Sequence, residues 1–438
     1  MSFADFNLHP LLLQALETAG YTEPTPIQAA ALPLAIAGRD LIGTAQTGTG
    51  KTAAFVLPAL QRIAATLDDK SGRPRQRGPH ILVLAPTREL AGQIVDAVRV
   101  LGKFMRLNTV SILGGMPYRL QMQQLSRPVD IIVATPGRLI DHLTRRTIDL
   151  SQLQLLVLDE ADRMLDMGFI DDVERIAAAS PSTRQTLLFT ATFDRRMTEL
   201  ANRLLTEPER IAVDVGNVTV DRIEQRLQIA DDLGHKRRLL AHWAASEEVG
   251  KAIIFAATKR DADQLAAELT AAGHNAAPLH GDMTQGARNH TVMRLRNGHI
   301  RLLVATDVAA RGIDVKDITH VINFDLPRQA EDYVHRIGRT GRAGATGIAI
   351  SFASPADKGL VDRIERYTGA PLVPHVVTGL EPQSGFHSRP KRRFGRPGEG
   401  GSWNKSGGPR PASAQPYGAR STGGHTGDAA RRSLRRVG

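Results

Sequence analysis

Short, wholly apolar runs alternate with helix-length segments along the first 210 or so residues, and this alternation restricts the chain to few folds. Strands with one face in water alternate apolar and polar residues, whereas parallel strands covered on both faces are apolar throughout. We therefore expect a doubly wound α/β domain with helices on both faces of a parallel sheet. The predicted strands span residues 41–43, 81–84, 110–113, 131–133, 155–158 and 187–189.

The alternation lapses at a short polar stretch near residue 214 and then begins again, which predicts a second α/β domain. We place the first domain at residues 1–213, a linker at 214–220 and the second domain at 221–370. A basic, turn-rich segment within the first domain, residues 70–79, is predicted to be an exposed loop. The second set of predicted strands spans residues 223–229, 253–255, 302–304, 321–322 and 348–350.

The composition changes near the end of the chain. From Glu381 to Gly438 there are 12 Lys and Arg against 3 Asp and Glu, so this segment carries most of the net charge of +11. Its 12 Gly, 6 Pro and 7 Ser leave too little apolar surface to offset the loss of chain entropy on folding. We predict a disordered basic tail at residues 371–438, of the kind that binds nucleic acid or another anionic surface.

Several classes of protein are excluded by what the sequence lacks. There is no cysteine, which excludes disulfides, cysteine-ligated metal sites and a cysteine nucleophile. The start of the chain lacks the basic-then-apolar layout of a signal peptide, and no apolar run approaches the ~18 residues that a membrane helix needs. We expect a cytoplasmic protein without a membrane partner.

A glycine-rich segment lies between the first predicted strand and a helix that begins near Ala53. Its spacing predicts a loop whose backbone N–H groups surround the phosphates of a nucleotide. Lys51 would reach the outer phosphates of ATP, and Thr52 would bind Mg²⁺. The alternative is a glycine-rich turn with a chance Lys-Thr, and the general pattern has Gly where this chain has Ala. The segment reads Ala45, Gln46, Thr47, Gly48, Thr49, Gly50, Lys51 and Thr52.

Two carboxylates follow the predicted strand 155–158. Asp159 and Glu160 would stand beside the phosphate loop, because ligands of parallel α/β sheets bind at the carboxyl ends of the strands. Asp159 would hold Mg²⁺, largely through water, and Glu160 would orient and deprotonate the attacking water. A solvated acidic strand end is the alternative for these residues taken alone.

Three arginines in the predicted second domain are spaced three residues apart among glycines. Arg336, Arg339 and Arg342 suit phosphate recognition, since the planar guanidinium matches phosphate geometry. A solvated basic turn is the alternative. If these arginines complete the nucleotide site, hydrolysis would depend on closure of one domain against the other.

These motifs together resemble those of the DEAD-box ATP-dependent RNA helicases. Residues 159–162 read Asp-Glu-Ala-Asp, and the resemblance extends from about Phe3 to Gly369. It implies two tandem RecA-like domains and an adenine-reading Q motif formed by Phe3, Tyr21 and Gln28. The start of the chain and its basic tail look most like the bacterial RhlE-type branch.

The resemblance also implies roles for residues that are unremarkable singly. Arg339 and Arg342 would be arginine fingers for the γ-phosphate, with Gly312 and Asp314 also at the nucleotide. Asp162, Thr190, Thr192 and His335 would couple the nucleotide site to RNA, with Thr190 standing where the family has Ser. The implied RNA contacts are Thr87, Arg88, Gly115, Thr135, Arg138, Gln285 and Thr306.

We therefore expect an RNA-dependent ATPase that locally unwinds RNA duplexes. The implied RNA contacts are hydroxyls, glycine N–H groups and arginines, which suit phosphates and 2′-hydroxyls rather than base edges. A DNA translocase of similar architecture, a non-enzymatic RNA clamp, and an RNA-binding tail regulated by the core are the alternatives. The sequence leaves the RNA target, the biological process and the oligomeric state open.

Overall fold

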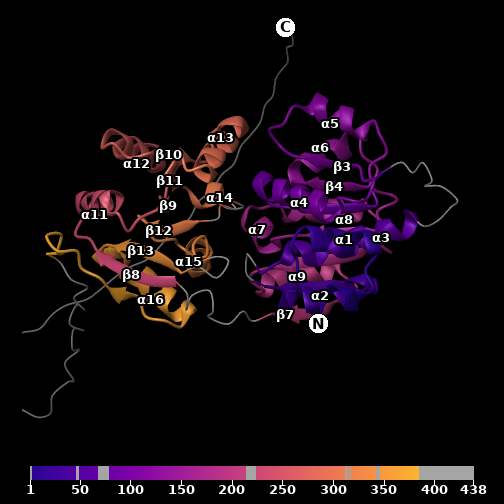
Figure 1. Cartoon of the computed structure of the whole chain (residues 1–438), viewed down its shortest axis with the longest axis horizontal. Helices are drawn as coiled ribbons and strands as arrows, with labels where there is room; N and C mark the ends of the chain where they lie inside the picture. Colours follow the sequence, from indigo (N-terminus) through magenta and orange to yellow (C-terminus); the bar gives the residue numbers. More distant parts are fainter. Residues whose placement is uncertain are drawn as a thin grey trace, which may run out of the picture. The chain divides into compact units, whose positions relative to one another are not determined.

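Two parallel sheets, each with helices on both faces, form the part of the chain that the structure describes, which confirms the predicted fold class (Figure 1). This computed structural model describes residues 2–45, 49–67, 78–213, 223–310, 313, 315, 317–341 and 346–383. We call residues 2–213 the first lobe and residues 223–383 the second lobe. The predicted linker, residues 70–77 of the predicted loop, and the tail after residue 383 lie outside the described residues.

The first lobe carries a seven-stranded sheet in the order β3-β4-β2-β5-β6-β1-β7. Its strands are β1 (Leu41–Thr44), β2 (Ile81–Leu84), β3 (Thr109–Ile112), β4 (Ile131–Ala134), β5 (Leu155–Leu158), β6 (Gln185–Thr190) and β7 (Glu209–Ala212). Its helices are η1 (Phe3–Phe6), α1 (Pro10–Thr18), α2 (Pro26–Ile36), α3 (Lys51–Leu67), α4 (Arg88–Leu101), α5 (Tyr118–Leu125), α6 (Pro136–Thr144), α7 (Ala161–Asp166), α8 (Ile170–Ala178) and α9 (Arg195–Leu204).

The second lobe repeats this topology, with the order β10-β11-β9-β12-β13-β8-β14. Its strands are β8 (Ile223–Ile229), β9 (Lys251–Phe255), β10 (Ala276–Leu279), β11 (Leu302–Ala305), β12 (Ile318–Asn323), β13 (Gly347–Ala353) and β14 (Val373–Pro374). Its helices are α11 (Leu233–Ala245), α12 (Lys259–Ala271), α13 (Gln285–Arg296), α14 (Asp307–Ala310), α15 (Ala330–Ile337), η2 (Pro355–Asp357) and α16 (Lys358–Thr368).

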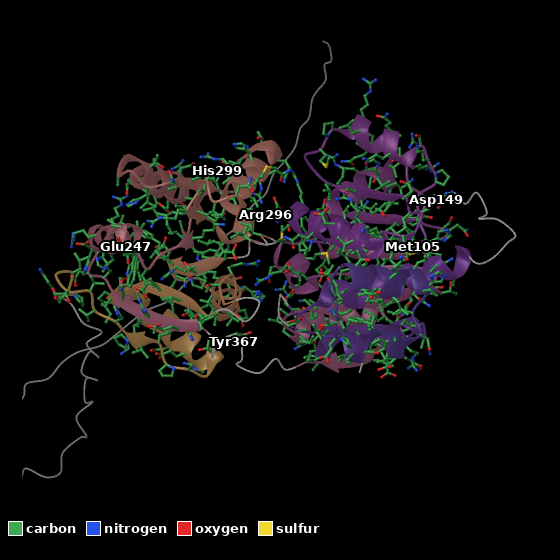
Figure 2. All side chains as sticks on the ribbon, in the orientation of Figure 1. Met105, Asp149, Glu247, Arg296, His299 and Tyr367 are labelled. Carbon is green, nitrogen blue, oxygen red and sulfur yellow. The ribbon has the colours of Figure 1, made fainter. Side chains whose placement is uncertain are left out.

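The core of each lobe lies on both faces of its sheet, as wholly apolar strands require. Along β2, Ile81 and Val83 pack with Phe55 of α3 on one face, whereas Leu82 packs with Leu139 of α6 on the other. Figure 2 shows side chains filling the space between sheet and helices in both lobes. All strand pairs are parallel, so the carboxyl ends of the strands in each sheet share one edge.

The second lobe extends beyond the boundary that the sequence predicts. Residues 371–383, which we predict as the start of the tail, instead pack on this lobe. Strand β14 pairs with β8, and the backbone N–H of His375 donates to the carbonyl of Leu227 at 2.7 Å. Leu372 and Val377 on either side of β14 are buried. Apolar residues spaced several positions apart secure this segment, so composition alone does not reveal it.

Candidate functional site

The predicted phosphate loop and the predicted acidic pair follow strands on the same half of the first sheet. Strand β6 lies between β5 and β1, and Thr44 at the end of β1 pairs with Thr190 at the end of β6. The segments that leave β1, β5 and β6 therefore start side by side at one edge of the sheet. This edge is where parallel α/β sheets bind ligands.

The described part of the phosphate loop packs closely against helix α2. Lys51 begins α3, is buried, and its Nζ donates to the carbonyl of Ala45 at 2.8 Å. Gly50 has a φ of +93°, and a Cβ at this position would lie 2.5 Å from Nε2 of Gln28. Position 50 therefore requires glycine for both its backbone conformation and its close packing. Gln46, Thr47 and Gly48 lie outside the described residues.

Gln28 connects the predicted Q motif to this loop. Its Oε1 accepts from the backbone N–H of Thr25 at 3.0 Å, and its Nε2 donates to the carbonyl of Gly50 at 3.0 Å. Phe3 is buried beside Tyr21, with ring centroids 6.3 Å apart in an edge-to-face arrangement. A buried amide with both ends bonded holds the loop to α2, so Gln28 positions the loop.

The acidic pair combines burial with an unusual backbone conformation. Burial raises the pKa of the Asp159 carboxyl to about 7, with Lys51 acting in the opposite direction. Glu160 is 8% exposed and has φ 53° and ψ 52°, a left-handed conformation that costs a non-glycine residue about 1 kcal/mol or more. This conformation comes directly before α7 and turns the chain sharply at the strand end. Strain of this kind at a buried carboxylate points to a functional requirement.

These residues also fit a magnesium nucleotide. Mg²⁺ is commonly held by one or two protein oxygens together with substrate phosphates and water. Asp159 is a buried carboxylate beside Lys51, and Thr52 supplies a hydroxyl from the first turn of α3. Among the described residues, no group of three or more His, Asp or Glu is placed to bind a metal by itself.

The predicted coupling residues of the first lobe form one hydrogen-bonded cluster. Oδ2 of Asp162 accepts from the backbone N–H groups of Ala191 and Thr192, both at 3.2 Å, and from Oγ1 of Thr192 at 3.3 Å. Oγ1 of Thr190 donates to the carbonyl of Thr192 at 2.7 Å. The acidic tetrad after β5 is thus bonded directly to the segment after β6, and Thr190 uses the hydroxyl that it shares with Ser.

A second group of predicted site residues follows β2, β3 and β4, on the other half of the same sheet. Oγ1 of Thr87 caps α4 by accepting from the N–H of Leu90 at 3.2 Å. Oγ1 of Thr135 accepts from the N–H of Gly114 at 3.3 Å, and Nη1 of Arg138 donates to the carbonyl of Met116 at 3.0 Å. The predicted RNA-contacting residues of this lobe are therefore bonded to its backbone near one another.

Arg88 connects this group to the second lobe. Its guanidinium lies where a Cβ on Gly115 would be, and its Nη1 donates to Oε1 of Gln285 at 2.9 Å. Glu89 accepts from Nε2 of Gln285 at 3.2 Å and from Nε of Arg288 at 2.9 Å. Glu89 and Arg288 lie within motifs of the resemblance, residues 85–90 and 285–288, but neither was predicted to have a role of its own. Opposite charges at the starts of α4 and α13 were the signal that could have identified them.

The predicted contact Thr306 stands at a strand end in the second lobe. It follows β11, and its carbonyl accepts from the N–H groups of Ala309 and Ala310. Its own N–H donates to the carbonyl of Leu279, the last residue of β10, at 3.2 Å. These bonds hold Thr306 at the carboxyl edge of its own sheet.

The three predicted phosphate-binding arginines differ in their surroundings. Arg336 is buried and internal, so the prediction that it recognises phosphate is wrong. Its guanidinium donates to both oxygens of Asp307, at 2.6 and 2.7 Å, and to Oδ1 of Asn323 at 3.1 Å. Because Nε, Nη1 and Nη2 are all hydrogen-bonded within the protein, the guanidinium has no pair of N–H groups left to bind a phosphate.

Arg339 lines a small recess together with His335 and Asp332. Its Nη1 donates to the carbonyl of Ile313 at 3.1 Å. Asp332 also accepts from Nη1 of Arg163 in the first lobe at 2.7 Å, an ion pair that no sequence motif predicted. Gly312, Asp314 and Arg342 lie outside the described residues.

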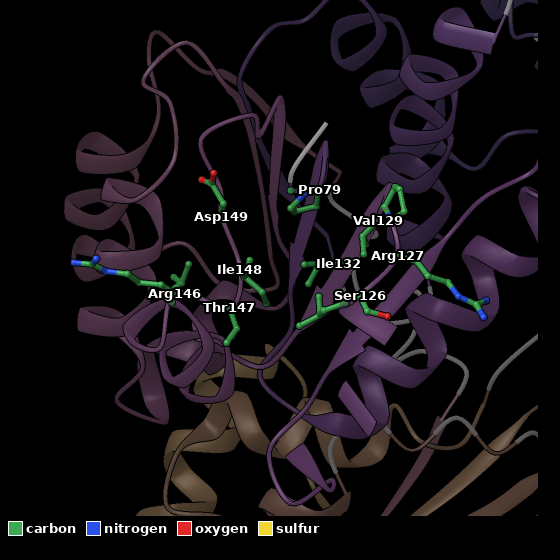
Figure 3. Close-up of a pocket in the computed structure, with 13 residues that line it drawn as sticks. Pro79, Ser126, Arg127, Val129, Ile132, Arg146, Thr147, Ile148 and Asp149 are labelled. Atoms are coloured by element: carbon green, nitrogen blue, oxygen red, sulfur yellow. The ribbon is translucent and has the colours of Figure 1, made fainter. Parts of the chain in front are cut away.

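A pocket of about 930 Å³ in the first lobe contains none of the predicted site residues (Figure 3). It lies between the segments that precede β2, β4 and β5, away from the carboxyl ends of the strands. Arg127 and Arg146 extend from opposite sides of it, and its lining includes Pro79, Ile132 and Ile148. The site described above is therefore separate from this hollow.

Two helicase family models match this chain, one in each lobe. The model "DEAD/DEAH box helicase" matches residues 25–200, and "Helicase conserved C-terminal domain" matches residues 234–344. The chain is 44% identical over 384 residues to "ATP-dependent RNA helicase SrmB" of Escherichia coli (strain K12), covering 87% of this chain and 85% of that relative. It is 44% identical over 371 residues to "DEAD-box ATP-dependent RNA helicase CshA" of Bacillus subtilis (strain 168), covering 84% and 72%.

Two solved structures that contain RNA are similar to this chain over most of its length. S. cerevisiae Dbp5 bound to RNA and ADP BeF3 matches with a TM-score of 0.77 and 33% identity, covering 85% of this chain and 95% of that one. DEAD-box helicase Mss116 bound to ssRNA and UDP-BeF matches with a TM-score of 0.75 and 28% identity, covering 86% and 79%. Within the described ranges, every helix is too short or too polar to span a bilayer.

Proposed function

The chain belongs to the DEAD-box family of ATP-dependent RNA helicases, and from this premise we propose that it hydrolyses ATP to separate or remodel RNA duplexes locally. One observation carries this proposal. A single edge of the first sheet bears Lys51, Asp159 and Glu160 on one half and the Arg88–Gly115–Thr135 group on the other. The first sheet can thus link ATP hydrolysis at one half of its edge to contact with the RNA backbone at the other half.

Hydrolysis would use residues at this edge together with two arginines of the second lobe. Glu160 takes a proton from the attacking water, whose oxygen forms the new bond to the γ-phosphorus as the bond to ADP breaks. Lys51 and the arginines Arg339 and Arg342 stabilise the charge on the transferred group. Thr52 and Asp159 would hold Mg²⁺, which would supply positive charge to offset the negative charge of the phosphates. The adenine would lie beside Phe3, Tyr21 and Gln28.

Coupling to RNA passes through the cluster around Asp162. Asp162 is bonded to Ala191 and Thr192, so a shift in the acidic tetrad moves the segment that follows β6. ATP and RNA together would favour the closed arrangement of the lobes, in which one RNA strand fits only when bent. Product release would reopen it. His335 and Thr306 would contribute from the second lobe.

The branch of the family, the location in the cell and the mode of RNA recognition also belong to this proposal. An RhlE-type branch rests on the start Phe3-Ala4-Asp5-Phe6 and on the basic tail, while relatives at 44% identity are named SrmB and CshA. A cytoplasmic location fits a chain without cysteine whose substrate is RNA. The proposed contacts are to backbone phosphates and 2′-hydroxyls, so we expect little sequence specificity in the core.

Steady-state ATPase assays with RNA, with DNA and without nucleic acid test the function. We expect stimulation by RNA only, and equal stimulation by DNA would favour a translocase instead. Glu160→Gln should abolish turnover but still form an ATP-dependent complex with RNA, because Lys51 and Asp159 remain. The exposed carboxylate Glu17 on α1 offers a control, and Glu17→Gln should behave as the wild type. Near-normal hydrolysis by Glu160→Gln would show that Glu160 is not the base.

A further inference from the structure

Two buried polar side chains in the first lobe belong to none of the motifs described above. Gln121 on α5 is 1% exposed and His142 on α6 is fully buried. Burying such groups is unfavourable unless they are hydrogen-bonded. Nε2 of Gln121 donates to the carbonyl of Leu113 at 2.8 Å, and its Oε1 lies 3.0 Å from Nε2 of His142. Nδ1 of His142 lies 2.8 Å from Oγ1 of Thr147.

The carbonyl that Gln121 holds belongs to the loop between β3 and α5, residues 113–117. This loop contains Gly115, against which the guanidinium of Arg88 packs. The loop is bonded at three places: Thr135 accepts from the N–H of Gly114, Arg138 donates to Met116, and Gln121 donates to Leu113. Thr135 and Arg138 are partly exposed and are proposed to contact RNA themselves. Gln121 is buried, so it can act only through the loop.

His142 fixes the orientation of the Gln121 amide. A ring N–H at Nε2 donates to Oε1 of Gln121, which leaves the amide NH₂ directed at Leu113. The ring is held in turn by stacking on Tyr118, with centroids 4.4 Å apart and planes 13° apart. Arg145 lies over the same Tyr118 ring at 4.9 Å. The hydrogen bond from His142 thus distinguishes the two ends of the amide.

We propose that Gln121, oriented by His142, is a positioning residue for RNA binding that holds the Gly114-Gly115 loop and, through it, Arg88. This inference rests on the proposed function, because it assumes that Arg88 and its neighbours contact RNA. Gln121 has no part in nucleotide binding, since the loop it holds follows β3, at the far edge of the sheet from β1. Its loss should therefore change the affinity for RNA and leave ATP turnover at saturating RNA intact.

The test replaces the amide without changing the size of the side chain. In full-length protein, Gln121→Met removes the hydrogen bonds and keeps a similar volume. We expect the RNA concentration that gives half-maximal ATPase stimulation to rise about five- to tenfold, the equivalent of one or two hydrogen bonds. The KM for ATP and the rate at saturating RNA should stay within about twofold of the wild type, a split that general destabilisation would not give.

Gln185 on β6 provides a matched control. It is also a buried glutamine, and its Nε2 donates to the carbonyls of Ala35 and Arg39 at 3.0 and 2.7 Å. It lies at the amino-terminal end of its strand, at the edge opposite the site. Gln185→Met makes the same chemical change and should leave the half-saturating RNA concentration unchanged. Thermal melting of both variants compares their stability.

A double variant tests the link through His142. His142→Phe keeps a ring to stack on Tyr118 but removes the donor to Gln121, so it should raise the half-saturating RNA concentration about two- to threefold. Combined with Gln121→Met it should add nothing further, because both changes break the same chain of bonds. If Gln121→Met does not fold, His142→Phe decides the matter by the same measurement.

The outcomes separate the two proposals. If RNA does not stimulate the wild-type ATPase, the proposed function fails and this inference fails with it. If RNA stimulates the wild type, unchanged half-saturation in Gln121→Met, or an equal rise in Gln185→Met, overturns the positioning role of Gln121 alone.

Discussion

The Asp159 carboxylate illustrates how the proposed site departs from what would be best for folding. It is almost fully buried, its pKa is raised to about 7 by that burial, and it stands beside a second carboxylate in a strained conformation. Carboxylates with a pKa raised by burial are concentrated at functional sites, so this arrangement agrees with the proposed nucleotide site. The cluster at Asp162 differs, since both oxygens of its carboxylate accept hydrogen bonds from backbone N–H groups, and Oδ2 also accepts one from a hydroxyl.

Asp159→Asn should therefore separate stability from activity. An amide in place of the buried carboxylate removes the cost of burying a charge at neutral pH. We expect the free energy of unfolding of the nucleotide-free protein to rise by about 1 kcal/mol, while RNA-stimulated ATPase is lost. Urea denaturation at pH 8 and an ATPase assay on the same preparation measure both quantities. A clear loss of stability would show that the carboxylate contributes native-state bonds that Asn cannot replace.

Strand β14 shows how a short element can complete a lobe. It contains only Val373 and Pro374, both exposed, yet the residues beside it are fixed on the second lobe. The backbone N–H of Leu372 donates to Oε1 of Glu365 at 2.9 Å, and the Leu372 side chain is buried among α15, α16 and β8. The element is stabilised by what precedes and follows it rather than by its own side chains.

Truncation on either side of β14 should have different effects. A chain ending at residue 370 loses buried Leu372 and Val377, and we expect the second lobe to be destabilised by about 3 kcal/mol. A chain ending at residue 383 keeps both residues and should have the same melting temperature as the full-length protein. The three chains are compared by thermal unfolding, with circular dichroism as the signal. Equal melting temperatures for the chains ending at 370 and 383 would mean that β14 adds no stability.

The two lobes share one strand order, so the chain presents two equivalent carboxyl edges. Contacts between the lobes bring together residues from distant parts of the sequence, as in the Arg163–Asp332 ion pair and the bond between Arg88 and Gln285. Residues 381–438 carry +9 of the net charge of +11. We therefore expect the lobes and the basic segment to contribute separately to RNA binding.

Removing the tail after residue 383 should weaken RNA binding without slowing catalysis. Its arginines and lysines lie among Gly, Pro and Ser with Phe394, Trp403 and Tyr417 interspersed, a composition suited to nonspecific binding of phosphates. For every phosphate that the truncated chain no longer neutralises, the dependence of log affinity on log salt concentration should flatten by ~0.7 for single-stranded RNA. RNA titrations at several salt concentrations compare the full chain, the truncated chain and a full-length variant with Gln at each tail Lys and Arg. Identical slopes and affinities would identify the tail as a solubilising segment.

The wholly apolar strands and the motifs next to them could be predicted because each depends on neighbouring residues. Runs such as Leu155 to Leu158 have one stable environment, a parallel strand covered on both faces, and the residues that follow then fall at the carboxyl edge. Strands β7, β10 and β14 were not predicted. They lie at the edges of their sheets and have exposed or half-exposed residues, so their sequences lack a continuous apolar run.

The remaining features depend on partners far apart in the chain. Arg336 resembles a phosphate ligand by its spacing, but folding places it against Asp307 and Asn323, which occupy its guanidinium. Gln121 has no local signature, and its role emerges only where α5, α6 and the Leu113 carbonyl meet. Local pattern thus determined the fold class and the order of the motifs. Tertiary structure decided which polar groups are hydrogen-bonded inside the protein and which remain available to ligands. The hydrogen-bond partners of a buried group are fixed only when the chain has packed.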